Sequence, residues 1–173
     1  MADAFLMCGA YQRANLLFRL YCIIILALSF TFEEHFFKAT GSRRLMSSKA
    51  KILVVDDQMA VAAMIRFLLA RAGCETQGAL DAKTALRLAQ SQAFDLITLD
   101  LEMPGLNGFD LFRRLRQIPH LAETPIVFVA GNASIENQQR GLDLGAADFI
   151  EKPFDTQDFI SRILSLVEET AAA

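Results

Sequence analysis

The chain has few cysteines, and they form no recognisable motif. Cys8, Cys22 and Cys74 are odd in number and lie far apart among the 173 residues. No Cys-x-x-Cys pair occurs, and no spacing of cysteine and histidine is typical of zinc ligands, which excludes a disulfide framework and a structural zinc site. This cysteine usage fits a reducing cytoplasm, and Cys74 is expected to be a small apolar core residue.

The chain also lacks an excess of positive charge. Lysine and arginine together number 17 against 20 aspartates and glutamates, which gives a formal net charge of −3. Nucleic-acid-binding domains are usually basic, so this balance argues against nucleic acid as the main partner. Blocks of like charge and low-complexity tracts are missing as well, and the length suffices for one well-buried domain with a remainder.

No apolar run matches a typical membrane-spanning helix. The uncharged stretch from Leu20 to Phe32 is shorter than the roughly 20 apolar residues that such a helix needs. Its length is closer to a signal-peptide core, but no small-residue cleavage motif follows it. Three interpretations stay open: a short membrane anchor, a defective export signal, or sequence outside the working protein, since Met46 resembles a translation start. If the stretch is an anchor, the more positive flank on its C-terminal side would keep the C-terminal part of the chain in the cytoplasm.

Strand and helix patterns alternate five times in the rest of the chain. Gly73 and Gly145 are expected to end helices, and Asp81 and Ser134 to cap them. The alternation predicts an α/β fold in which a five-stranded parallel sheet carries crossover helices on both faces. The predicted strands cover residues 51–55, 74–79, 95–99, 126–129 and 149–150, and the last helix covers residues 154–167.

Charged residues stand at the ends of three of these strands. Asp56 and Asp57 follow the first strand, Asp100 follows the third, and Lys152 follows the fifth. Pro153 helps to fix the backbone that aims Lys152, and a cis peptide bond is one way to do so. The carboxyl ends of parallel strands meet at one edge of a sheet, where open α/β sheets place their ligand sites. We therefore expect three carboxylates and one ammonium group to lie together.

These groups have the chemistry that phosphoryl transfer requires. Mg²⁺ prefers oxygen ligands, and a carboxylate can attack a phosphoryl group to form an aspartyl phosphate. The charge of the transition state would then be stabilised by the ion and by Lys152. Each residue alone has a simpler explanation: Asp56 or Asp57 as a helix cap, Asp100 as a turn residue, Lys152 as a solvated strand end. Those explanations do not account for the shared placement at strand ends.

In combination, three motifs resemble the receiver domains of two-component response regulators. The motifs are residues 53–57, 99–108 and 152–154, and the resemblance covers about Lys49 to Glu169. It implies a flavodoxin-like fold of five parallel strands and five flanking helices. The chain is accordingly divided into an apolar extension at residues 1–48, a receiver domain at residues 49–169 and a tail at residues 170–173.

The resemblance also implies the roles of the site residues. Asp100 would accept a phosphoryl group from a sensor histidine kinase or a histidine phosphotransfer protein, and Lys152 would contact the phosphoryl oxygens. The ligands of Mg²⁺ would be Asp56, Asp57, Asp100 and the backbone carbonyl of Glu102. The Glu102 side chain is expected at the rim of the pocket, either tuning dephosphorylation or as a solvated loop charge.

Two positions concern the switch that follows phosphorylation. Receivers usually carry threonine or serine at the end of the fourth strand, where this chain has Ala130. The missing hydroxyl removes one hydrogen bond to the phosphate, worth about 1 kcal/mol and up to about 3 kcal/mol for a charged acceptor. Phe149 stands where many receivers carry a switching tyrosine or phenylalanine. With Ala130 beside it, the ring has room to pack inward, which suggests a domain biased toward an active-like arrangement without phosphate.

The leading interpretation is a stand-alone, single-domain response regulator. It would be a phosphoacceptor, not an enzyme acting on other substrates, and a downstream protein would bind the face of the fourth helix, fifth strand and fifth helix, residues 134–167. The alternative is a pseudo-receiver, a constitutive binding module, for which Ala130 is the support. An aspartate-based phosphatase of the dehalogenase type would need a second aspartate where this chain has Glu102. His35 and His120 stand at no ligand spacing and are expected on the surface.

Overall fold

The computed structural model describes residues 49–131 and 133–172 of the chain. The interpretations of Leu20 to Phe32 and the prediction for His35 lie outside the described residues, as do Cys8 and Cys22. Among the described residues, no helix has both the length and the apolar character needed to cross a membrane.

Five strands form one parallel sheet, as predicted. Their order across the sheet is β2-β1-β3-β4-β5, so the first strand along the chain lies second from one edge. In the strand pairing, Val55 lies beside Leu99, Leu99 beside Phe128, and Phe128 beside Phe149. The strands are β1 (Lys51–Val55), β2 (Glu75–Ala79), β3 (Leu96–Leu99), β4 (Ile126–Ala130) and β5 (Asp148–Glu151).

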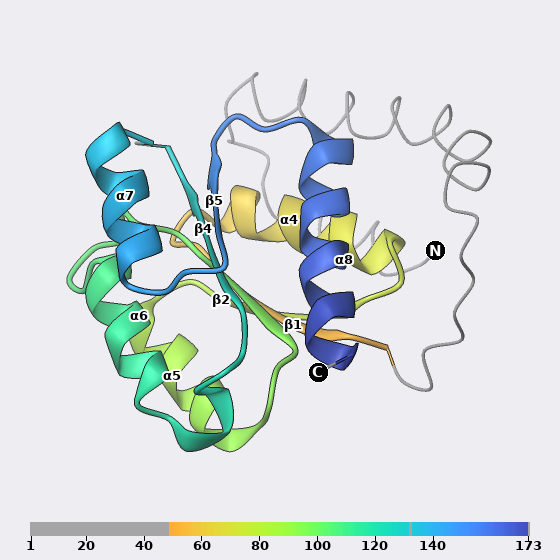
Figure 1. The fold of residues 1–173 in the computed structure, drawn as a ribbon, viewed down its shortest axis with the longest axis horizontal. Helices are drawn as coiled ribbons and strands as arrows, with labels where there is room; N and C mark the ends of the chain where they lie inside the picture. The colour runs from red at the N-terminus through yellow and green to blue at the C-terminus, as the bar shows by residue number, and fades with distance from the viewer. Residues whose placement is uncertain (1–48, 132, 173) are drawn as a thin grey trace, which may run out of the picture. The chain divides into compact units, whose positions relative to one another are not determined.

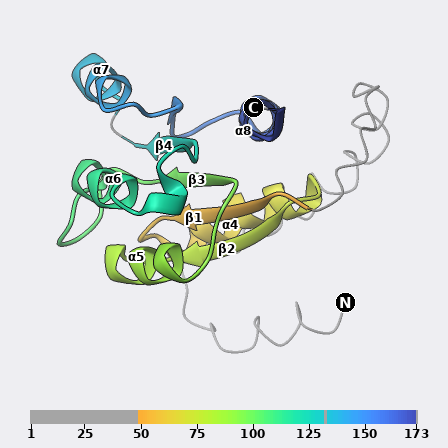
Figure 2. The ribbon, with the colours of Figure 1, turned by 60° about the horizontal axis from the view of Figure 1, so that its bottom comes forward.

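Helices cover both faces of this sheet. Figure 1 and Figure 2 show α5, α6 and α7 on one side of the strands and α4 and α8 on the other. The predicted α/β architecture of five parallel strands with five flanking helices is therefore confirmed. The helices are α4 (Met59–Arg71), α5 (Ala82–Ser91), α6 (Gly108–Arg116), α7 (Ile135–Asp143) and α8 (Thr156–Ala172), with a short 3₁₀ helix, η1 (Pro119–Leu121).

The starts of several helices follow from local side-chain contacts. The Asp81 carboxylate accepts a hydrogen bond from the Thr84 backbone N–H at 2.7 Å, and the Ser134 hydroxyl accepts one from Asn137 at 3.2 Å, so both predicted caps are confirmed. α8 begins two residues later than predicted because the Asp155 carboxylate caps it.

Two hydrophobic layers lie against the sheet. On the α5–α6 side, the rings of Phe109, Phe112 and Phe149 surround Phe128, with centroids 5.3, 5.6 and 5.9 Å from it. On the other side, α8 presents the inward face that the sequence predicted. The buried residues of that face are Phe159, Ile163 and Val167. Cys74 is buried as well, as expected, and burial raises the pKa of its thiol.

Candidate phosphoacceptor site

The strand ends hold the backbone of three of the charged site residues. The Asp56 N–H donates to Ala79 of β2 at 3.1 Å, and the Asp100 N–H donates to Val55 of β1 at 2.9 Å. The Lys152 N–H donates to the carbonyl at the end of β4, also at 2.9 Å. The sheet hydrogen bonding therefore continues into the site and fixes where each of these side chains begins.

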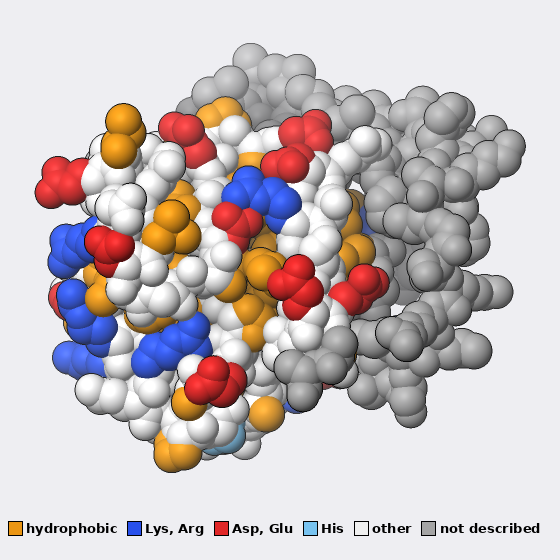
Figure 3. Space-filling view, in the orientation of Figure 1, with side chains coloured by type: hydrophobic (Ala, Val, Ile, Leu, Met, Phe, Trp, Pro, Cys, Tyr) orange, Lys and Arg blue, Asp and Glu red, His pale blue; other side chains and the backbone are white. Residues whose placement is uncertain are grey.

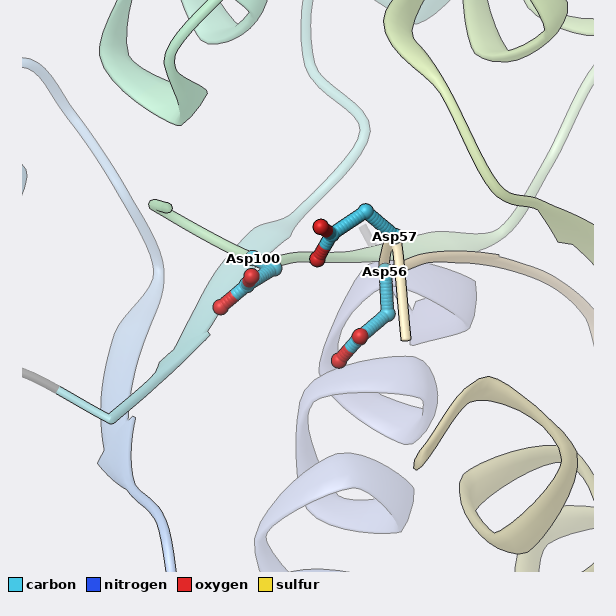
Figure 4. A group of neighbouring side chains, drawn as sticks. All are labelled: Asp56, Asp57 and Asp100. Atoms are coloured by element: carbon cyan, nitrogen blue, oxygen red, sulfur yellow. The ribbon is translucent and has the colours of Figure 1, made fainter. Parts of the chain in front are cut away.

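The three carboxylates that the sequence singled out converge at this edge. One oxygen from each of Asp56, Asp57 and Asp100 lies within 4.8 Å of the others, in an arrangement able to hold a metal ion (Figure 4). Asp56 and Asp100 are buried, whereas Asp57 is half-buried. Carboxylate oxygens are the ligands that Mg²⁺ prefers, so the donor set fits that ion.

Lys152 joins this group from the end of β5. Its Nζ atom donates to Asp56 Oδ2 at 2.6 Å and to Asp100 Oδ1 at 3.0 Å, and its side chain is largely shielded from solvent. The Lys152–Pro153 peptide bond is cis, the option that the proline had suggested. The structure thus brings together all four charged residues that the sequence placed at strand ends.

The electrostatics of the site oppose three simultaneous negative charges. Burial raises the pKa of the Asp100 carboxyl, and the carboxylates of Asp56 and Asp57 act in the same direction, whereas the Lys152 ammonium acts against them. Asp56 has a donor on each oxygen, since its second oxygen accepts from the Gln58 backbone N–H at 2.9 Å. Excess negative charge therefore remains beside Asp100 and Asp57.

Asp57 carries the atom that most clearly lacks a partner. Among the residues that the structure describes, its Oδ1 atom is buried but receives no hydrogen bond. A buried carboxylate oxygen without a donor is costly, and a cation is the natural group to satisfy it. This oxygen and its neighbours on Asp56 and Asp100 support the fit of the site to a divalent cation.

Gly108 is a site-supporting residue whose role the sequence did not reveal. A Cβ atom there would collide with the Asp100 carbonyl oxygen and lie 2.8 Å from the Leu101 Cα. The Gly108 N–H donates to the Leu101 carbonyl at 2.9 Å, and Asn107 caps α6 through a bond from the Asp110 N–H. The Asn-Gly pair at residues 107–108 is the sequence signal that could have indicated a helix start packed closely against the neighbouring backbone.

The remaining candidate residues lie around the pocket or away from it. Ala130 is fully buried at the end of β4, and Phe149 is half-buried with its ring 5.9 Å from that of Phe128. The Glu102 side chain is exposed. His120 is exposed as expected, but its Nε2 atom lies 2.8 Å from the carbonyl oxygen of Ala89, a contact the sequence did not indicate. The proposed switch roles of Ala130 and Phe149 stay predictions.

Comparison with known proteins identifies the family of this chain. Residues 52–164 match the response regulator receiver domain. The chain belongs to the receiver domain family. Receivers bind Mg²⁺ at an acidic pocket, are phosphorylated, and interact with histidine kinases and downstream effectors. The acidic cluster of this receiver domain lies where such a pocket is expected at the sheet edge.

Individual relatives show the same match. The chain is 33% identical over 120 residues to the DNA-binding dual master transcriptional regulator RpaA of Synechocystis, covering 69% of this chain and 50% of RpaA. It is 35% identical over 117 residues to the response regulator ArlR of Staphylococcus saprophyticus, covering 68% and 52%. The chain therefore spans about half the length of the curated relatives it matches. Because RpaA is described as DNA-binding, the expected absence of a nucleic-acid partner stays a prediction.

A solved structure matches along nearly its whole length. The chemotaxis protein CheY4 of Vibrio cholerae superimposes on this receiver domain with a TM-score of 0.66 and 32% sequence identity. The match covers 69% of this chain and 99% of the CheY4 chain. The fold predicted by the resemblance is thereby confirmed for the receiver domain.

Proposed function

We propose that the receiver domain accepts a phosphoryl group on Asp100 from the phosphohistidine of a sensor kinase or a phosphotransfer protein. The observation that carries this proposal is the convergence of Asp56, Asp57 and Asp100 with Lys152, whose Nζ lies 2.6 and 3.0 Å from two of the carboxylates. The working unit is the domain at residues 49–169, in the cytoplasm, and it turns over no substrate other than its own phosphoryl group.

Each site residue has a separate task in this reaction. An Asp100 oxygen forms a bond to phosphorus while the phosphorus–nitrogen bond of the donor breaks, and the imidazole leaves with the bonding electron pair and takes up a proton. Lys152, which bridges Asp56 and Asp100 in the structure, contacts the phosphoryl oxygens and balances their charge. Its ammonium needs no proton transfer to do so.

Mg²⁺ completes the site. Asp56, Asp57, Asp100 and the backbone carbonyl of Glu102 would hold it, and the buried Asp57 oxygen without a donor among the described residues supports this assignment. When bound, the ion supplies positive charge beside the carboxylates and the phosphoryl oxygens. Removing the ion with a chelator is expected to abolish acceptance, because three crowded carboxylates would repel the incoming phosphoryl group.

The output surface is the face formed by α7, β5 and α8, about residues 134–167. Its α7 helix exposes two large apolar side chains, Ile135 at 87% and Leu142 at 50%. Exposed apolar groups of this size suit contact with a downstream protein. Ala130 supplies no hydroxyl to report the phosphate to this face, and that is the observation favouring the alternative, a pseudo-receiver that binds its partner constitutively.

The intact mass of the chain tests acceptance and separates the two functions. The chain is incubated with Mg²⁺ and acetyl phosphate, alongside Asp100→Asn and a sample in which EDTA replaces Mg²⁺. The proposal expects a gain of one phosphoryl group in the parent chain with Mg²⁺ only. A parent chain that stays unmodified under all conditions would support the pseudo-receiver instead.

A further inference from the structure

A second charged surface lies away from the phosphoacceptor site, along the junction of α6 and α7. Arg113 of α6 and Arg140 of α7 are both exposed, and Arg140 lies over the ring of Phe109, a buried residue of α6 four positions before Arg113. We call these three residues the arginine seam. Figure 3 shows lysine and arginine side chains gathered on the left of the molecule, over α6 and the adjoining part of α7. The seam stands out because the chain as a whole carries a net negative charge.

Arg140 lies over the face of an aromatic ring. Its guanidinium carbon lies 4.2 Å from the centroid of Phe109. Glu136 precedes it by one helical turn and Asp143 follows it by three residues, but within the described part of the chain neither carboxylate forms an ion pair with Arg140. Asp143 accepts instead from the Gln139 side chain at 2.8 Å. The contact with the ring therefore holds the guanidinium without using its N–H groups as donors to a carboxylate.

Arg113 and Arg116 lie on the same helix but differ in how far their guanidinium groups are available to bind a ligand. Arg113 is paired with Asp110, one turn earlier, at 2.9 Å, and both side chains are about half exposed. An exposed pair of this kind is weak and readily exchanged. Arg116 donates instead to backbone carbonyls of the chain itself, including Thr124 and Gly145, and so serves the fold. The seam thus offers Arg113 and Arg140 to a ligand and leaves Arg116 structural.

We propose that the arginine seam binds a carboxylate-rich segment of a partner protein. A guanidinium presents paired N–H donors that match the two oxygens of a carboxylate, and a stacked arginine loses less freedom on binding. The net negative charge of the chain repels an acidic segment elsewhere, which directs it to the seam. A nucleic acid fits less well than a short acidic segment, because its continuous row of phosphates extends past the two arginines onto the acidic remainder of the surface.

The arginine seam is separate from the phosphoacceptor site. Arg113 and Arg140 take no part in the Asp100 site, so acetyl phosphate is expected to modify variants of the seam as it modifies the parent chain. A loss of peptide binding with unchanged phosphoryl acceptance therefore tests the seam alone. Loss of acceptance in the parent chain would bear on the proposed function and leave the seam intact.

The test is a fluorescence anisotropy titration of the full chain with a short fluorescein-labelled peptide rich in glutamate and aspartate. The double variant Arg113→Gln/Arg140→Gln is expected to bind roughly tenfold more weakly or worse, because two charge-assisted contacts are lost. The matched control is Lys83→Gln/Arg87→Gln, which removes the same charge from the exposed face of α5 and is expected to change the affinity less than about twofold. Arg140→Lys, which keeps the charge and loses the planar fork, is expected to fall between them.

Three results would overturn the proposal. The first is equal weakening by the seam variant and the α5 variant, which would mean that only net charge matters. The second is no saturable binding by the parent chain. The third is tighter binding of a labelled DNA duplex than of the acidic peptide through the same two arginines, which would assign the seam to nucleic acid.

Discussion

At the scale of single residues, the Asp100 carboxyl group is held among groups that oppose its ionisation. Its pKa is raised chiefly by burial, with Asp56 and Asp57 adding to the effect and Lys152 working against it. A carboxyl whose pKa is higher in the folded state contributes stability at low pH and loses that contribution as the pH rises through its folded pKa. The negative charge that suits the site for metal and phosphate is thus a cost to the metal-free fold.

Asp100→Asn is therefore expected to raise the melting temperature of the metal-free chain at neutral pH. The amide removes the buried charge, and its oxygen can still accept from Lys152. The gain should shrink as the pH is lowered through the raised pKa of the parent carboxyl, where that group takes up its proton. Thermal unfolding in EDTA at several pH values measures it. A variant less stable than the parent at neutral pH, or a gain independent of pH, would contradict the electrostatic account.

Thr98 carries the other orphaned polar atom of the described residues. Its hydroxyl is buried in β3, two residues before Asp100, and makes no hydrogen bond there. Thr98→Val replaces the hydroxyl with a methyl group of the same shape and is expected to stabilise the fold by about 1 kcal/mol. Urea unfolding checks this against Thr84→Val, which removes an exposed bond to Asp81 and should not stabilise. Destabilisation by Thr98→Val would show that the hydroxyl has a partner in solution.

At the scale of elements, the close contact of α6 with the loop after β3 fixes the Asp100 backbone. Gly108 lies so near the Asp100 carbonyl and the Leu101 Cα that a side chain there would displace backbone, and backbone cannot yield as a flexible side chain can. The start of α6 and the backbone of Asp100 are therefore one structural unit.

Gly108→Ala is expected to destabilise the fold by about 2 kcal/mol and to lower the yield of phosphorylated chain, because the loop must shift to admit the methyl group. The matched control is Gly131→Ala at the end of β4, where an added Cβ would meet no atom within 4 Å. Urea unfolding and the intact-mass assay measure the two effects. Equal behaviour of the two alanine variants would show that the contact at Gly108 does not constrain the site.

The contacts at the helix starts explain which helix boundaries could be predicted from the sequence. Asp81 and Ser134 cap their helices through bonds to residues three positions away, so their sequence pattern was sufficient. Asp155 caps α8 in the same way. The preceding apolar residue, Phe154, continues the helical pattern of apolar positions, so the predicted start of this helix lay too far toward the N-terminus. The η1 turn could not be predicted because three residues carry no periodicity.

At the scale of the whole molecule, the site exists because the alternation of strand and helix brings the carboxyl ends of β1, β3 and β5 to the same edge of the sheet. Short apolar runs in the sequence indicate this alternation. The strand ends therefore predicted that four residues would lie together: Asp56, Asp57, Asp100 and Lys152. Contacts between distant side chains had no such pattern. The position of Arg140 on the Phe109 ring and the absence of a described partner for Asp57 Oδ1 depend on how helices and loops pack.

The most direct test of the central claim is to locate the phosphoryl group on the chain. Borohydride reduces an aspartyl phosphate to homoserine, so peptides of the chain treated with Mg²⁺ and acetyl phosphate can be mapped by mass spectrometry after reduction. We predict homoserine at position 100, none when Mg²⁺ is replaced by EDTA, and none in Asp100→Asn. Homoserine at Asp56 or Asp57 instead, or at no position, would contradict it.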